Sequence, residues 1–250
     1  MTRAESERIA VLADVHGNAT ALEAVLAEVV RAGAELVVSC GDLTWGPQPL
    51  ETLALIEALP LPVLHVRGNA DRSVVELADG GEGERTPREA WMVAAHGQTG
   101  RDVLAGFAPT VSVEVAGLGT ILCSHGSPRS DEECVTVETP EERLREALDG
   151  VGADLVATAH THVQYDRRVL GRRLFNPGSV GMPYEGRRGA YWALLGPELE
   201  LRRTEYDVQQ AVAAYRATTD PLVEDMVEIL LEPPTAAEAI EHAERVVFSG

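Results

Sequence analysis

The chain contains no lysine: all 21 of its basic residues are arginine. This absence excludes the two chemistries that need a lysine amine, a P-loop lysine that binds nucleotide phosphates and Schiff-base catalysis. No uninterrupted apolar run approaches the roughly 20 residues that a membrane-spanning helix needs. We therefore expect no membrane partner. The polar start of the chain and the short apolar run Ile9–Ala13 predict a cytoplasmic location rather than a signal peptide.

Cysteine is also scarce, with only Cys40, Cys123 and Cys134. An odd number of cysteines without C-x-x-C spacing argues against both a disulfide framework and a structural zinc site. Cys40 and Cys123 each end an apolar run, which predicts buried thiols.

Positive charge is in short supply as well, because 40 acidic residues against 21 basic ones give a formal net charge of −19. Nucleic acid is bound through many basic contacts to phosphates, so a nucleic-acid partner is not expected. The same negative field disfavours docking of phosphoproteins. An anionic substrate would need a local positive centre, such as bound metal ions.

The front two-thirds of the chain repeats one pattern, in which a short β-branched apolar run is followed by a polar turn. Such runs are typical of buried strands in α/β proteins. The runs followed by a turn that contains Asp, Asn or His are Ile9–Ala13, Glu35–Cys40, Val63–Val66, Thr120–Ser124 and Asp154–Ala159. The sequence after residue 206 is mostly helical. We expect one domain over 1–250, with a helical C-terminal extension at 207–250 packed on it.

Polar side chains at these strand ends are expected to converge, because ligand sites lie outside the carboxyl ends of the strands in an open α/β sheet. The seven residues are Asp14, His16, Asp42, Asn69, His125, His160 and His162. Mixed carboxylate, amide and imidazole ligands suit Mn²⁺, Fe²⁺ or Zn²⁺ better than Ca²⁺. Seven ligands are too many for one small ion and enough for two ions that share a carboxylate. Two such ions about 3.5–4 Å apart hold a hydroxide and clamp an in-line displacement.

The order of the motifs resembles the calcineurin-like metallophosphoesterases. The motifs are D-x-H at 14–16, G-D at 41–42, G-N-x-D at 68–71, H-G at 125–126 and H-x-H at 160–162. The short spacings and N-P-G-S at 176–179 are similar to the small bacterial and archaeal phosphodiesterase branch of that family. The resemblance implies a four-layer α/β/β/α sandwich of mixed sheets with the metals at the sheet edge.

The resemblance also implies how the ligands divide between two divalent ions, with one carboxylate bridging both. One ion takes Asp14, His16 and His162. The other ion takes Asn69, His125 and His160, and Asp42 bridges both ions. Mn²⁺ is the expected metal, with iron, zinc, nickel and magnesium as alternatives.

One position departs from the family pattern. Many members carry a histidine directly after the Asn of G-N, where it protonates the leaving group or contacts the phosphate, and this chain has Ala70 there. General-acid help is worth roughly 10²–10⁴-fold in rate. Three explanations stay open: a substrate with a good leaving group such as a phosphodiester, another proton donor such as His96, or weak catalysis.

Two more polar residues lie next to the predicted ligands. Asn18 suits either a hydrogen bond to a substrate phosphate at a helix start or a helix cap. Asp71, which we assign to the catalytic apparatus, suits either a hydrogen bond that orients a ligand histidine or ordinary turn chemistry.

The leading hypothesis is a two-metal phosphodiesterase or phosphatase that acts on a small nucleotide-like phosphate ester, with a metal-bridging hydroxide attacking phosphorus. The alternative is a non-catalytic metal-binding assembly scaffold of the same fold. The presence of all seven ligands favours chemistry. The C-terminal helices either pack on the sandwich or cap a neighbouring subunit of a homo-oligomer, and the sequence leaves both open.

Overall fold

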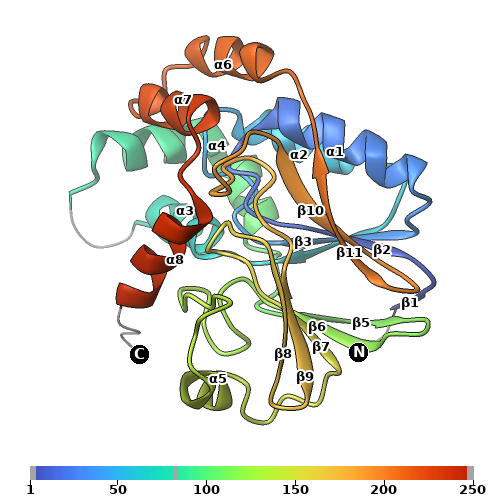
Figure 1. Ribbon diagram of the computed structural model, residues 1–250. Coiled ribbons are helices and arrows are strands. Elements are labelled where there is room, and N and C mark those ends of the chain that lie inside the picture. Colours follow the sequence, from blue (N-terminus) through green and yellow to red (C-terminus); the bar gives the residue numbers. More distant parts are fainter. Residues whose placement is uncertain (1–3, 81–83, 247–250) are drawn as a thin grey trace.

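Two β-sheets face each other at the centre of the computed structural model, which describes residues 4–80 and 84–246 (Figure 1). One sheet has the strand order β11 (Leu199–Thr204), β10 (Ala190–Leu195), β2 (Ile9–Leu12), β3 (Leu36–Cys40) and β4 (Val63–Val66). Strands β2, β3 and β4 are parallel, whereas β10 runs antiparallel to both β2 and β11. The carboxyl ends of the three parallel strands therefore lie together at one edge.

The second sheet is also mixed. Its order is β1 (Ala4–Ser6), β5 (Val111–Val115), β6 (Gly119–Cys123), β7 (Leu155–Ala157), β9 (Arg172–Asn176) and β8 (Tyr165–Val169). Strands β6, β7 and β9 are parallel to one another, and β5 and β8 pair antiparallel at the two sides. Strands β5 and β6 form one hairpin and β8 and β9 form another, and their turns lie at 117–119 and at 171, where the sequence has glycines.

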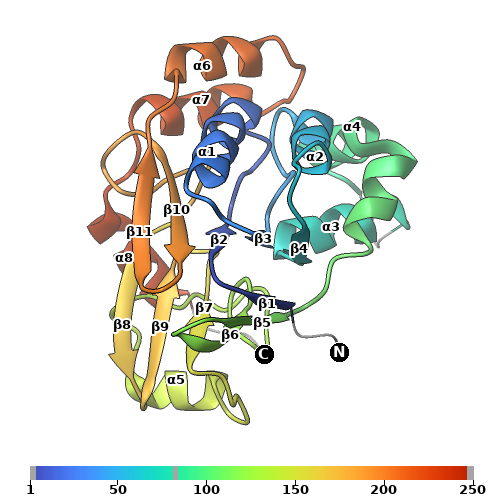
Figure 2. The same ribbon diagram turned by 90° about the vertical axis from the view of Figure 1, so that its right-hand side faces the viewer.

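Helices cover the outer faces of both sheets (Figures 1 and 2). The helices are α1 (Ala19–Arg31), α2 (Pro49–Glu57), α3 (Asn69–Ala78), α4 (Pro87–Leu104), α5 (Glu141–Ala147), α6 (Val208–Arg216), α7 (Val223–Leu231) and α8 (Ala236–Arg245). Helices α1, α2 and α4 lie on the five-stranded side, and α5 lies below the six-stranded sheet (Figure 1).

Three apolar cores separate four layers. Strand β2 shows why, since alternate residues of a strand face opposite sides: Leu12 packs with Leu22 of α1, whereas Val11 packs with Phe175 of the other sheet. The third core joins the six-stranded sheet to Leu144 of α5. This arrangement confirms the four-layer α/β/β/α sandwich predicted from the sequence. Cys40 and Cys123, both buried free thiols, lie in the core between the sheets.

The segment after residue 206 is helical, as expected, as far as the structure describes it. Helix α6 lies against α1, and Tyr215 of α6 packs with Met226 of α7 in a small core of their own. Residues 247–250 of the predicted extension lie outside the described residues. Within 4–80 and 84–246, no helix combines the length and the apolar character required to cross a bilayer.

The sequence interpretation missed one helix and one strand. Gly68–Asp71 reads as a turn, but Asn69 begins helix α3 with Gly68 as its N-cap. Strand β1 lies in the polar start of the chain, where it pairs in parallel with β5. The helix start matters for function, because it fixes Asn69 and Asp71 on a rigid element.

Acid is expected to destabilise the fold partly through His65 of β4. Its ring stacks on Phe107 at 4.4 Å and 4°, and its Nδ1 is buried without a hydrogen-bond partner. Burial lowers the pKa of His65 to about 4, below the unfolded value of about 6.5. Because the pKa is lower in the folded state, the stability that depends on a neutral His65 is present above pH 6.5 and is lost as the pH falls toward 4.

We therefore expect the wild type to lose about 1–2 kcal/mol more unfolding free energy than His65→Leu between pH 7 and pH 5. Urea unfolding of both proteins at the two pH values measures this difference, and the other titrating groups cancel in the comparison. Equal losses of unfolding free energy in the wild type and in His65→Leu would show that His65 does not resist protonation in the folded state.

Candidate metal centre

The predicted ligands all follow strand ends, and the structure brings them to one place between the two sheets. Asp14 and His16 follow β2, Asp42 follows β3, and Asn69 follows β4. The remaining three follow strands of the other sheet: His125 after β6, and His160 and His162 after β7. Short hydrogen bonds continue the pairing of β2 with β3 beyond the strands, since the amide of His16 donates to the carbonyl oxygen of Asp42 at 3.0 Å.

The backbone at these positions is held in the left-handed region, which residues other than glycine rarely adopt. Six such residues have positive φ in the described part of the chain, and five of them are predicted ligands. The five are Asp14 (52°), His16 (46°), Asp42 (52°), His160 (65°) and His162 (59°). Each costs on the order of 1–3 kcal/mol, a strain that clusters at functional sites. The backbone thus marks the same site as the side-chain chemistry.

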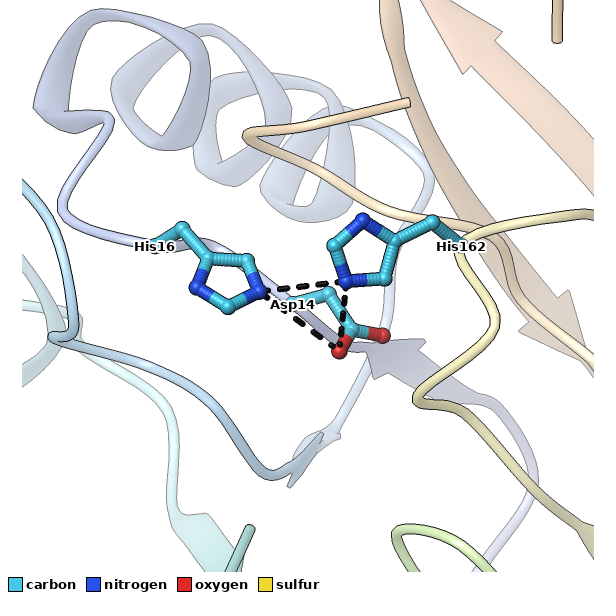
Figure 3. Close-up of side chains that lie close together, drawn as sticks. All are labelled: Asp14, His16 and His162. Carbon is cyan, nitrogen blue, oxygen red and sulfur yellow. Dashed lines mark hydrogen bonds and ion pairs between the residues drawn. The ribbon is translucent and has the colours of Figure 1, made fainter. Parts of the chain in front are cut away.

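One group of ligand atoms consists of Asp14, His16 and His162 (Figure 3). Figure 3 shows the two imidazole rings converging on the Asp14 carboxylate from different loops. Nε2 of His16 lies 3.1 Å from Nε2 of His162, and Asp14 Oδ1 lies 3.3 Å from His162 Nε2 and 3.9 Å from His16 Nε2. All three side chains are buried.

The second group consists of Asp42, His125 and His160. Asn69 belongs beside it, because its Oδ1 lies 3.0 Å from His125 Nε2. The rings of His125 and His160 meet edge to face at 5.0 Å. His160 and Asn69 are partly exposed, whereas the other five predicted ligands are buried.

Asp42 lies between the two groups. Its Oδ2 is 3.7 Å from His16 Nε2 on one side and 3.5 Å from His125 Nε2 on the other. Its other oxygen, Oδ1, accepts a hydrogen bond from the amide of Ala70 at 2.9 Å. The carboxylate is therefore fixed with one oxygen facing both groups, which is the position that a bridging ligand would take.

Three of the four histidines are oriented by main-chain carbonyl groups. The pairs are His16 with Trp45 (3.1 Å), His125 with Cys40 (2.8 Å) and His162 with Met182 (2.7 Å), in each case through Nδ1. A carbonyl oxygen only accepts, so each Nδ1 donates and the neutral ring presents a lone pair at Nε2. Such support fixes the tautomer and the ring orientation of a metal ligand.

Charges in the centre favour a bound cation. Burial opposes ionisation of Asp14 and Asp42, but the histidines that face them, His162 and His125, hold both pKa values below the usual range. Burial by itself would lower the pKa of His125, yet Asp42 and Asp14 raise it to about 10. Burial and then His125 lower the pKa of His160 to about 4. The negative field that raises the pKa of His125 equally favours a metal ion at its Nε2, in place of a proton.

The donor set fits a divalent cation. Asp14 Oδ1 is buried and has no hydrogen-bond partner, and beside it the lone pairs of His16 and His162 face each other. The carboxylate oxygen and the two imidazole nitrogens are all hydrogen-bond acceptors, and with no donor between them they repel one another. One cation bound between them would satisfy all three. Ligand atoms that are each about 2.0–2.2 Å from one ion lie about 3 Å apart at right angles, which matches the spacing of the two imidazole nitrogens.

Residues 8–196 match the model of the calcineurin-like phosphoesterase superfamily domain. The chain belongs to this superfamily. An uncharacterized protein from Methanocaldococcus jannaschii is 26% identical over 226 residues, which cover 81% of this chain and 89% of that protein.

Two solved structures are similar over most of their length. A hypothetical protein from Pyrococcus horikoshii OT3 has a TM-score of 0.77 and 22% identity, with 92% of this chain and 99% of that chain covered. A metallophosphoesterase from Sphaerobacter thermophilus has a TM-score of 0.72 and 24% identity, with 91% and 99% covered. At these identities the likeness shows the fold, and the two sheets with their flanking helices are shared.

Asp71 of this calcineurin-like domain orients backbone rather than a histidine. Its carboxylate accepts from the amides of Asp42 (2.9 Å), Leu43 (3.1 Å) and Gly68 (2.9 Å), and it is fully buried. Burial and the nearby Asp42 charge raise the pKa of Asp71 to about 7. Asp71 thus joins the loops that carry Asp42 and Asn69, and its predicted part in the catalytic apparatus stays a prediction.

Asn18 serves as the N-cap of α1. Its Oδ1 accepts from the amide of Ala21 at 3.0 Å, and its Nδ2 donates to the carbonyl of Gly181 and the hydroxyl of Tyr206. The side chain is fully buried. Both amide hydrogens are therefore engaged, and the predicted substrate contact of Asn18 stays a prediction.

His96 lies in the core, and both of its ring nitrogens are engaged. Nδ1 is 2.8 Å from the carbonyl oxygen of Met92, and Nε2 is 2.8 Å from Thr44 Oγ1. Burial lowers its pKa. This environment gives His96 a structural role and offers no free proton for a leaving group.

Two further supports hold the centre, and sequence reasoning missed one of them, Tyr184. The ring of Tyr184 stacks on His162 at 4.5 Å. The N-P-G-S turn holds both ligand loops: Ser179 Oγ donates to the Asp14 carbonyl at 2.7 Å, and Asn176 Nδ2 donates to the Ala159 carbonyl at 2.9 Å. The motif itself was visible in the sequence, whereas nothing before folding marks Tyr184.

Proposed function

We propose that this protein is a phosphodiesterase or phosphatase that depends on two divalent ions and acts on small nucleotide-like phosphate esters. The observation that carries the proposal is Asp42 Oδ2, fixed 3.7 Å from His16 and 3.5 Å from His125 between two groups of ligand atoms. The residues proposed for one ion are Asp14, His16 and His162, and for the other Asn69, His125 and His160, with Asp42 shared. A cytoplasmic location and the homo-oligomer remain predictions.

Divalent ions at this centre would supply an activated water nucleophile and positive charge for the transition state. The protein's contribution is preorganisation. Carbonyl groups fix three imidazoles, the Ala70 amide fixes Asp42, and Asp71 ties the two loops together. Mixed oxygen and nitrogen donors of this kind suit Mn²⁺, with iron, zinc, nickel and magnesium as alternatives.

The side chain at position 70 limits the substrate. Ala70 offers no proton, and His96, the other donor considered, is enclosed in the core. The leaving group must therefore depart with little help, which favours substrates that release a weakly basic anion, such as aryl phosphodiesters, pyrophosphates and aryl esters, over alkyl esters. The net charge of −19 disfavours long polyanions as substrates.

Hydrolysis of two chromogenic esters tests this function. Protein stripped with a chelator is supplied with Mn²⁺ and given bis-p-nitrophenyl phosphate and p-nitrophenyl phosphate. We expect hydrolysis only with metal, and a higher kcat/KM for the diester than for the monoester; both esters release p-nitrophenolate, so the comparison reports diester preference and does not depend on a general acid. Two bound ions without hydrolysis of either ester, or of a panel of nucleotides, would favour the assembly scaffold instead.

A further inference from the structure

A segment outside the matched family domain contacts the loop that supports His162 and the loop that follows His125. The domain match ends at residue 196, and residues 232–246 follow α7 and contain α8. In Figure 1 this segment descends from the helices above the five-stranded sheet, passes the loops between the two sheets, and ends on the side of α5. It therefore spans both halves of the sandwich.

The start of the segment is anchored on the loop that supports His162. The amide of Gly186 donates to the carbonyl of Pro234 at 2.7 Å, and Thr235, the N-cap of α8, packs against Gly186. Two residues before Gly186 is Tyr184, whose ring stacks on His162 and whose amide donates to the His162 carbonyl. This anchor lies next to the first group of ligands.

The end of the segment is anchored on the loop that follows His125. Glu244 Oε1 accepts hydrogen bonds from the hydroxyls of Thr136 and Thr139, both at 2.6 Å, and Oε2 accepts from Arg143 at 3.0 Å. Thr136 and Thr139 are buried, and the Glu244 side chain is only 20% exposed. One carboxylate thus connects α8 to the chain between β6 and α5, in which His125 lies.

We propose that residues 232–246 form one wall of the approach to the metal centre and limit the substrate to small phosphate esters. Helix α8 has ten residues and a length of about 15 Å, and its two anchors lie beside the loops of the two ligand groups. A polymeric diester must extend past the centre in two directions, and this wall blocks one of them. A small diester needs no such passage. Glu244 is the residue that positions the wall.

The inference rests on the proposed function and is tested by substrate size. Glu244→Ala removes all three anchoring bonds, whereas Glu241→Ala is a matched control on the same helix, since Glu241 is 65% exposed and pairs with Arg245. A third protein ends at Leu231 and lacks the segment. The size comparison uses a dinucleoside monophosphate as the small diester and a short single-stranded oligonucleotide, whose bonds release the same sugar alkoxide. Bis-p-nitrophenyl phosphate reports basal activity, and all three substrates are given with Mn²⁺.

We expect the ratio of kcat/KM for the oligonucleotide to that for the small diester to rise about 10-fold or more in Glu244→Ala and in the shortened chain. Glu241→Ala should match the wild type. Hydrogen exchange gives a second readout that does not depend on bound metal: amides in 126–140 and 182–188 should lose protection only when α8 is released.

Two results would overturn the proposal: an unchanged ratio although exchange shows α8 released, or equal loss of both activities in the released proteins. If the wild type cleaves the small diester and the ratio does not move, only this inference fails. If the wild type cleaves neither ester, the phosphoesterase function fails first.

Discussion

Asp42→Asn is expected to lower the Mn²⁺-dependent hydrolysis of bis-p-nitrophenyl phosphate by roughly 10³-fold or more, equivalent to about 4 kcal/mol. The substitution keeps the shape of the side chain, and Oδ1 retains its acceptor role toward the Ala70 amide. The atom that faces His16 and His125 changes from a charged acceptor to an NH₂ group. The position that a shared ligand would occupy then repels both cations.

The same reasoning predicts a fold that survives. The new amide donates toward the two imidazole nitrogens that Asp42 Oδ2 now faces, so unfolding free energy should stay within about 1 kcal/mol of the wild type. Calorimetric titration should show weaker binding of Mn²⁺. The control is Asp149→Asn, which removes the charge of an exposed carboxylate. Activity retained in Asp42→Asn would refute the shared-ligand role.

The position of the centre could be predicted from the sequence because it depends on strand order and strand ends. A buried strand reads as a short apolar run, and the residue after it lies at the sheet edge. Asp14, Asp42 and His125 each stand at such a point, so their convergence required no knowledge of the loops. The four-layer arrangement followed from the family resemblance and agrees with the observed cores.

The supports of the centre could not be predicted, because their partners have no sequence signature. Any residue supplies a carbonyl oxygen, so nothing marks Trp45, Cys40 or Met182 as the groups that orient three histidines. The partners of Asp71 are backbone amides for the same reason. Nothing in the sequence marks Glu244 as the hydrogen-bond partner of Thr136, which lies 108 residues away.

Gly68→Ala is expected to disable the centre without removing any polar group. A Cβ at this position would lie 2.1 Å from Asp42 Oδ1 and 2.4 Å from the Asp42 amide nitrogen. Both contacts are far below van der Waals distance, and Asp71 and Ala70 hold Asp42 on its other sides. Asp42 must therefore move, and a displacement of about 1 Å at a reacting centre costs on the order of 10²-fold in rate.

The steric origin of this loss separates it from a general effect of alanine. Gly68 has φ −87°, which alanine adopts freely, so backbone strain contributes nothing and overpacking costs about 1–3 kcal/mol of unfolding free energy. Gly152→Ala is the matched control, because a Cβ there meets nothing within 4 Å. The rate of hydrolysis and the unfolding free energy from urea titration should both fall in Gly68→Ala. Neither quantity should change in Gly152→Ala. A Gly68→Ala protein that is destabilised yet fully active would mean that the position of Asp42 does not set the rate, and the bridging role would fall with it.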